Sequence, residues 1–197
     1  SDPFMNVITL REGKERSLLR RHPWVFQGSI AKGGADAGET VRVQDAAGRF
    51  LAWAAFSPSS MIRVRVWSFD DAERIDEAFF ERRIARALGL RARLPIASDG
   101  VRLVHGEADG LPGLIVDRYG DLLSAQFLSA GTERWKGVIA DLLLKATGCT
   151  RLYERSDSGV RKLEGLEPAT GWLRGEGGTE VTIREHGWKL TLDVAEG

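Results

Sequence analysis

The sequence predicts an α+β protein, in which a small mixed β-barrel precedes a central α+β domain. Three observations predict this class. Short apolar segments alternate with turns over the first 72 residues, and an amphipathic segment follows from about residue 76. After residue 100, an antiparallel meander of three segments is followed by a helix and by further strands.

The first domain is expected to cover residues 5–72. Strands are predicted at residues 7–10, 41–43 and 50–54, with a short helix at residues 13–20. A further strand at residues 61–67 has two faces, because side chains alternate with period two. One face carries Ile62, Val64 and Val66, and the other carries Arg63, Arg65 and Trp67. We expect the aliphatic face to be core and the other face to point out of the barrel.

The second domain, residues 73–197, is expected to begin with a linker helix that Asp76 caps. Apolar residues at helical spacing from Phe80 to Leu88 predict one buried stripe. The meander is predicted at residues 101–105, 114–118 and 122–128. A second helix should begin at Thr132 and end at Gly148. Residues 151–154 then resume extended structure, and residues 181–183 are expected to pair with 189–192.

Composition excludes several function classes. The chain has 28 basic and 28 acidic residues, but residues 1–70 hold ten basic against seven acidic ones, so the positive charge lies at the front. One cysteine, Cys149, and three histidines predict neither a disulfide nor a metal site. Apolar stretches such as residues 51–56 are too short to cross a bilayer. We expect a cytoplasmic protein with no membrane partner.

Several ordered motifs carry a resemblance to a known family. They are Arg20-Arg21-His22-Pro23-Trp24-Val25-Phe26, Phe56-Ser57-Pro58-Ser59-Ser60, Gly106-Glu107-Ala108-Asp109-Gly110-Leu111-Pro112-Gly113-Leu114, Arg155-Ser156-Asp157 and Glu164-Gly165. Together they resemble the large-subunit ribosomal RNA methyltransferase I family, which makes 5-methylcytosine in 23S rRNA. The resemblance runs from about Leu10 to Gly197, and ordered motifs are more specific than any one alone.

The resemblance implies a PUA-type barrel that binds RNA, followed by the family's central domain. It also implies that the chain is an amino-terminal fragment, with the Rossmann-like methyltransferase domain absent. No glycine-rich strand-to-helix loop with a downstream acidic residue occurs in the sequence. The resemblance implies S-adenosylmethionine as cofactor of the full-length parent, and we expect this fragment to bind no such cofactor and to be inactive. Residues 1–4, before Met5, are interpreted as an expression scar.

Candidate RNA-binding residues come from three regions. Cations can contact phosphates, and aromatic rings can stack on unpaired bases. The candidates are Arg11, Lys14, Arg20, Arg21, His22 and Trp24 at the front, Arg63, Arg65 and Trp67 on the outer strand face, and Arg161 and Lys162 in a later polar loop. Each has a structural alternative: a solvated helix face, a barrel core, or an ion pair with a nearby carboxylate.

Three further alternatives stay open. The chain is a stand-alone PUA-type RNA-binding module without catalytic activity, or its central domain only spaces two other domains. A homodimer through the central or the missing domain is a third. The thiol of Cys149 suggests the thiolate attack that cytosine-C5 methylation uses. We interpret Cys149 as structural, because no neighbour in the sequence would lower its pKa.

Overall fold

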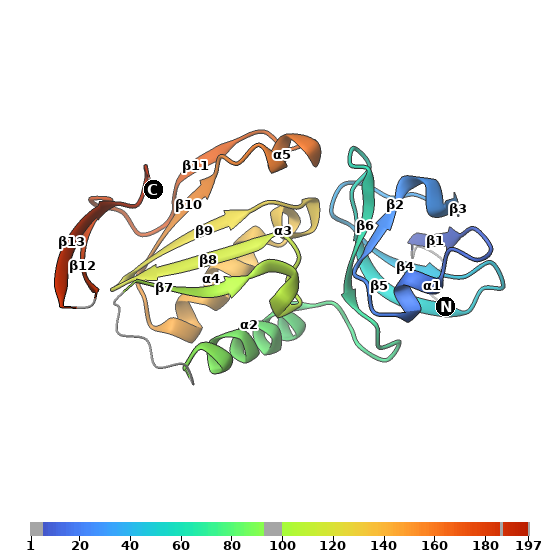
Figure 1. The fold of residues 1–197 in the computed structure, drawn as a ribbon, viewed down its shortest axis with the longest axis horizontal. Helices are drawn as coiled ribbons and strands as arrows, with labels where there is room; N and C mark the ends of the chain where they lie inside the picture. The colour runs from blue at the N-terminus through green and yellow to red at the C-terminus, as the bar shows by residue number, and fades with distance from the viewer. Residues whose placement is uncertain (1–5, 93–99, 186, 197) are drawn as a thin grey trace.

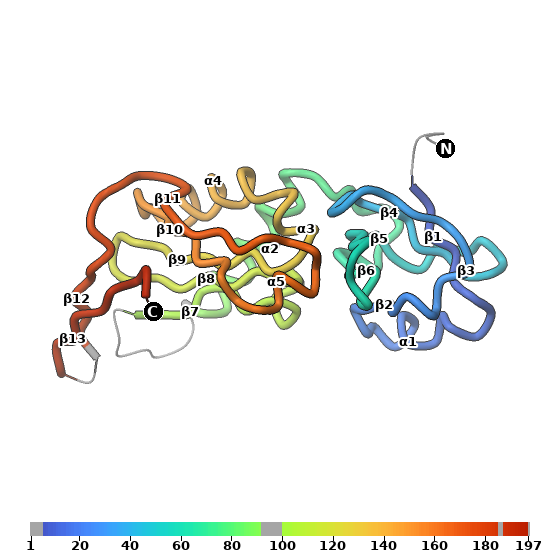
Figure 2. The backbone as a smooth tube through the Cα atoms, turned by 90° about the horizontal axis from the view of Figure 1, so that it is seen from above, coloured from blue at the N-terminus to red at the C-terminus, as the bar shows by residue number. Residues whose placement is uncertain are grey.

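The computed structural model describes residues 6–92, 100–185 and 187–196. These residues form two domains side by side along the long axis, each around its own apolar core (Figures 1 and 2). The interpretation of residues 1–4 as an expression scar concerns residues outside these ranges. Within the described ranges, no helix is long and apolar enough to cross a membrane. The same residues contain no group of three or more His, Cys, Asp or Glu side chains placed to hold a metal ion.

The first domain is a six-stranded mixed sheet that wraps around its core. The strand order is β2-β6-β5-β4-β1-β3. The pair β1–β4 is parallel, and the other neighbours are antiparallel. The strands are β1 (Asn6–Leu10), β2 (Trp24–Phe26), β3 (Ile30–Lys32), β4 (Thr40–Gln44), β5 (Phe50–Phe56) and β6 (Ile62–Ser68), with the short helices α1 (Arg16–Leu19) and η1 (Gln27–Ser29) between them.

Alternation in β6 correctly predicted that Val64 and Val66 enter the barrel, whereas Ile62, expected in the same core, is only half-buried. Val64 and Val66 are buried in the core of the first domain, together with Ile8, Val41 and Val43. The helix expected at residues 13–20 is shorter than predicted, because residues 11–14 form a turn in which Lys14 N donates to the carbonyl of Arg11. Strands β2 and β3, of three residues each, were not predicted.

The second domain begins with α2 (Glu77–Ala92), and the Asp76 carboxylate caps it by accepting a hydrogen bond from Phe79 N at 3.0 Å. Its five-stranded sheet has the order β11-β10-β9-β8-β7. Helices α2 and α4 lie together on one face of this sheet (Figure 1). The remaining elements are β7 (Gly100–His105), η2 (Gly106–Asp109), β8 (Leu114–Tyr119), β9 (Leu122–Phe127), α3 (Ala130–Arg134), α4 (Lys136–Thr147), β10 (Arg151–Ser156), α5 (Val160–Leu163) and β11 (Ala169–Arg174).

The helical region after β9 differs from the prediction in its start. Ser129, not Thr132, is the N-cap: its hydroxyl accepts from Thr132 N, and the Thr132 hydroxyl accepts from Ser129 N. The helix is divided at Trp135 into α3 and α4. It ends as predicted at Gly148, which adopts the left-handed conformation with φ 75°.

The predicted fold class requires correction in this domain. The meander β7-β8-β9 is antiparallel as expected, but β10 pairs with β9 in parallel. The connection through α3 and α4 crosses over the sheet, so that β9 and β10 run in the same direction. The five strands therefore form one mixed sheet, in which the strands that follow the helix, β10 and β11, extend the meander.

A two-stranded hairpin, β12 (Glu180–Glu185) and β13 (Trp188–Asp193), projects from the end of the second domain (Figure 1). Its pairing confirms the predicted hairpin. Ile183 is buried at 4% exposure and contacts the sheet edge near Gly100, whereas Trp188 is 75% exposed.

Candidate functional site

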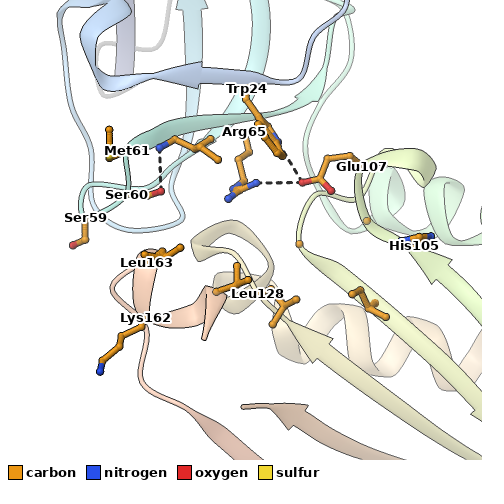
Figure 3. A pocket seen from close by; sticks show the side chains of 15 residues that line it. Trp24, Ser59, Ser60, Met61, Arg65, His105, Glu107, Leu128, Lys162 and Leu163 are labelled. Carbon is orange, nitrogen blue, oxygen red and sulfur yellow. Dashed lines mark hydrogen bonds and ion pairs between the residues drawn. The ribbon is translucent and has the colours of Figure 1, made fainter. Parts of the chain in front are cut away.

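A pocket of about 630 Å³ lies between the two domains (Figure 3). This volume is within the range of roughly 300–1,000 Å³ typical of ligand sites. The first domain contributes β2, the β5–β6 loop and β6, and the second contributes η2, β8, the end of β9 and α5. The lining residues that the argument uses are Trp24, Met61, Arg65, Glu107, Lys162 and Leu163.

Arg65 links the two domains at the back of this pocket. Its Nη1 lies 3.2 Å from Glu107 Oε1, and its Nε lies 3.3 Å from Glu164 Oε1. Its guanidinium carbon is 5.2 Å from the centroid of the Trp24 ring, and Trp24 Nε1 donates to Glu107 Oε1 at 3.3 Å (Figure 3). Arg65 is 8% exposed, so these contacts are made largely away from water.

Glu164 is the second centre of this network. It is 3% exposed, and its Oε1 also accepts hydrogen bonds from Ser57 Oγ at 3.1 Å and from Ala130 N at 3.3 Å. One carboxylate oxygen thus joins β6, the residue after β5 and the start of α3. Since α3 begins at Ala130, this negative charge also neutralises the amino-terminal end of that helix.

Close backbone packing holds the domains together around the network. A Cβ added to Gly131 would lie 2.6 Å from Ala55 Cβ and 2.7 Å from Trp67 Cζ2. A Cβ added to Gly165 would lie 2.6 Å from Ser59 Cβ. Only glycine fits at such approaches, and packed interiors tolerate no extra methyl group there. The pocket walls are therefore fixed relative to each other.

The outer face of β6 is not the solvent-facing surface that the sequence predicted. It points out of the barrel, but the second domain covers most of it. Trp67 is 2% exposed and packs edge-on against Phe79 and Phe80, with ring centroids 6.3 and 5.1 Å apart. The expectation that Arg65 and Trp67 are exposed is wrong, because both lie in the interface. Arg63 is half-buried, and its Nε donates to the carbonyl of Ser60 at 3.1 Å.

The front cluster is exposed at Arg11, Lys14, Arg20, Arg21 and His22. Arg21 has a positive φ of 66°, and its guanidinium lies over the Phe69 ring at 4.9 Å. His22 contacts Trp24 edge-on with ring centroids 5.8 Å apart, which connects the cluster to the pocket. Arg11, Lys32 and Arg63 also line a separate hollow of about 310 Å³.

The two residues predicted in the later loop lie in different environments. Arg161 is 3% exposed, and its Nη1 donates to the carbonyl of Phe127 at 2.7 Å and to Glu133 Oε2 at 2.6 Å. It is therefore a structural residue, and the expectation that it faces RNA in a polar loop is wrong. Lys162, next to it, is exposed at the rim of the pocket.

Burial on its own would raise the pKa of Glu133, but hydrogen bonds from Lys136 and Arg161 lower it below the usual value of 4.5. Lys136 Nζ also lies 2.8 Å from Glu154 Oε2. These charges stabilise the junction of α3, α4 and β10.

Cys149 is buried, as expected of a structural thiol.

Sequence reasoning missed Glu107, Glu164, Met61 and Leu163 as pocket or network residues. Both Glu107 and Glu164 were quoted only inside the motifs that carry the family resemblance, and neither was predicted as a site residue. The available signal was that both carboxylates lie inside the quoted motifs, beside glycines that need positive φ: Gly106 at 48° and Gly165 at 73°. A carboxylate fixed beside a turn that favours glycine is a candidate for a defined partner.

Comparisons with known proteins agree with these observations. Residues 8–69 match a family model described as a PUA-like domain. The whole chain is 46% identical, over 202 residues, to the ribosomal RNA large subunit methyltransferase I of Klebsiella pneumoniae, of which it covers 50%. It is 45% identical over 195 residues to the protein of the same name from Escherichia coli O139:H28 and covers 49% of it. The resemblance inferred from the motifs is confirmed, and the chain spans about half the length of these relatives.

Two solved structures share the fold. One is a putative SAM-dependent methyltransferase from Streptococcus mutans, with a TM-score of 0.77 at 17% identity, over 95% of this chain and 48% of that one. The other is a putative methyltransferase complexed with SAH, with a TM-score of 0.77 at 16% identity, over 95% of this chain and 47% of that one. At such identities the likeness establishes the fold alone.

These structures complete the correction of the fold class. Over 95% of its length, the chain shares the fold of about half of each of these two solved chains, whose titles name methyltransferases, and its second sheet, β7–β11, is mixed. The expectation of an α+β fold with the methyltransferase architecture absent is therefore wrong. That expectation came from the family resemblance and was supported by the missing glycine-rich loop, which marks a nucleotide site and does not decide the topology of a sheet.

Proposed function

We propose, from its likeness over the whole chain to ribosomal RNA large subunit methyltransferase I, that this protein is the RNA-recognition part of a SAM-dependent methyltransferase. Its substrate in this proposal is 23S rRNA, and the product is 5-methylcytosine. The observation that carries the proposal is the pocket between the PUA-like domain and the second domain, lined by both and fixed by Arg65. A single rigid surface can then read one RNA element with two domains.

Exposed basic residues on both domains suit RNA. Arg11, Lys14 and Arg20 are exposed on the PUA-like domain, and Lys162 is exposed at the rim of the pocket. Lysine and arginine contacts to phosphates supply most of the sequence-independent affinity for nucleic acid. They also fix the register of the RNA, while contacts to bases supply specificity.

The described residues do not fit S-adenosylmethionine. In an open α/β sheet, a nucleotide cofactor binds beyond the carboxyl ends of parallel strands. In the second sheet β9 and β10 are parallel, but the backbone N–H groups at the helix start after β9 already donate to the Glu164 carboxylate and the Ser129 hydroxyl. We therefore propose that the chain alone binds no S-adenosylmethionine and transfers no methyl group, and we derive no step through the cofactor.

RNA binding by the chain tests the proposal. Fluorescence anisotropy with short, tiled 23S rRNA fragments should find at least one fragment bound at least about tenfold more tightly than 16S rRNA fragments of the same length, which is a difference of about 1.4 kcal/mol. Equal affinity for every fragment would contradict recognition. The 5-methylcytosine assignment is tested separately, by nucleoside mass spectrometry of 23S rRNA treated with a full-length relative and S-adenosylmethionine.

A further inference from the structure

The mouth of the interdomain pocket is unusually apolar for a surface that should meet RNA phosphates. Met61, Val160 and Leu163 are 76%, 42% and 71% exposed, and all three line this pocket. Met61 and Leu163 stand on facing lips, one on each domain (Figure 3). Single exposed apolar side chains are normal on a protein surface. Several of them gathered at one cavity indicate a binding site.

The walls behind this mouth are also apolar. Ile62 comes from the first domain, and Ile115 and Leu128 come from the second. The space between two facing apolar walls suits a flat ring, which can be covered on both sides. A water molecule is poorly stabilised in such a space, because it needs two or more polar groups as hydrogen-bond partners.

The back of the pocket offers hydrogen bonds at one edge. Among the described residues, the hydrogen bonds of Glu107 all use Oε1, so Oε2 can accept from a ligand. Those of Arg65 use Nε and Nη1, so Nη2 can donate. Figure 3 shows the Arg65 guanidinium directed into the pocket beside the Glu107 carboxylate. An adjacent donor and acceptor match the Watson–Crick edge of a nucleobase.

Charge at the rim favours a nucleotide over other flat ligands. Lys162 is exposed beside the apolar lip, and Figure 3 shows its ammonium group directed away from the cavity. A base in the pocket would leave its phosphate outside, on the side of such a cation. In a paired helix the base edges are engaged and the rings are stacked, so only an unpaired base can enter.

We infer that the pocket between the PUA-like domain and the second domain takes one unpaired nucleobase of the bound RNA. The base lies between the apolar walls, with its polar edge on Arg65 and Glu107 and its phosphate near Lys162. This inference rests on the proposed function, because it names how that RNA is held.

A cycle between protein and RNA variants tests the inference. The probe is the 23S rRNA stem-loop that the chain binds most tightly, with each loop base replaced in turn by an abasic residue. One abasic position should weaken binding to the unaltered chain about tenfold. In the double variant Met61→Ser with Leu163→Ser, the intact stem-loop should bind about tenfold more weakly, and the same abasic change should then have no further effect.

The matched control is Leu90→Ser on α2, which also removes an exposed leucine, 47% exposed and not among the pocket residues. It should keep the full abasic effect, and thermal melting checks that each variant is folded. The inference is overturned if no single abasic position matters, or if its effect persists in the double variant, while the stem-loop still binds. Failure of every 23S rRNA stem-loop to bind the unaltered chain would instead refute the proposed function.

Discussion

Replacement of Arg65 by methionine should destabilise the protein far more than the same change at Arg63 on the same strand. Arg65→Met keeps an unbranched side chain but removes the charge between Glu107 and Glu164. Glu164 is 3% exposed and would remain a buried carboxylate with only the Ser57 and Ala130 donors.

The structure sets the size of this effect. Removal of one partner from a buried ion pair costs about 3–5 kcal/mol. Glu164 keeps two donors, and the Glu107 side chain is 35% exposed to water, so the expected cost is near the lower limit, about 3 kcal/mol. Arg63 makes one hydrogen bond to a carbonyl, worth about 1 kcal/mol.

Urea denaturation monitored by circular dichroism measures both variants. The double variant Arg65→Met with Glu164→Gln should regain at least about 1 kcal/mol relative to Arg65→Met alone, because the uncompensated charge is gone. Equal free energies of unfolding for the Arg65 and Arg63 variants would refute the reasoning. So would a double variant less stable than the single one.

Three other predictions follow from the packing, the charges and the cofactor fit. Gly131→Val should destabilise the protein by at least about 1–3 kcal/mol in thermal melting, because Ala55 and Trp67 leave no space for a Cβ, and an unchanged melting temperature would contradict the interface. Glu133 has a lowered pKa, so the stability that its ionised carboxylate contributes is present above about pH 4.5 and is lost as the pH falls through the pKa of the folded state. Glu133→Gln should therefore reduce the loss of stability on acidification. Identical acid titrations of the variant and the unaltered chain would contradict this. Calorimetry should detect no saturable binding of S-adenosylmethionine to the chain, and micromolar affinity would contradict the cofactor proposal.

Local signals in the sequence predicted many elements correctly, since they depend on nearby residues. The Asp76 cap, the Gly148 stop and the alternation in β6 each depend on side chains a few positions apart. The pairing of β10 with β9 depends on a crossover through α3 and α4. No short-range pattern encodes that choice, and the sequence therefore predicted a further strand after the helix without its pairing direction.

The candidate site was predicted less well, because its residues are brought together by domain packing. Alternation placed Arg65 and Trp67 outside the barrel, and this is correct, but it could not show that a second domain covers them. Arg161 was read as a loop cation, although Glu133, 28 positions earlier, holds it in the interior. Lys162 stays a candidate for RNA contact because it is exposed. Single-sequence patterns do not distinguish a buried arginine from an exposed lysine, so Arg161 was predicted together with it.

The salt dependence of RNA affinity is the most direct test of whether the exposed cations of the PUA-like domain contact RNA. The measurement compares the unaltered chain with Arg11→Ala and Arg63→Ala combined, which removes two cations from one hollow. Arg49→Ala is the control, because the Arg49 side chain is 82% exposed on the same domain and pairs with Asp45. If both arginines contact phosphates, the slope of log affinity against log salt should flatten by about 0.7–0.9 per lost contact in the double variant and stay unchanged in the control. Equal slopes for all three proteins, or no saturable binding at low salt, would contradict the account.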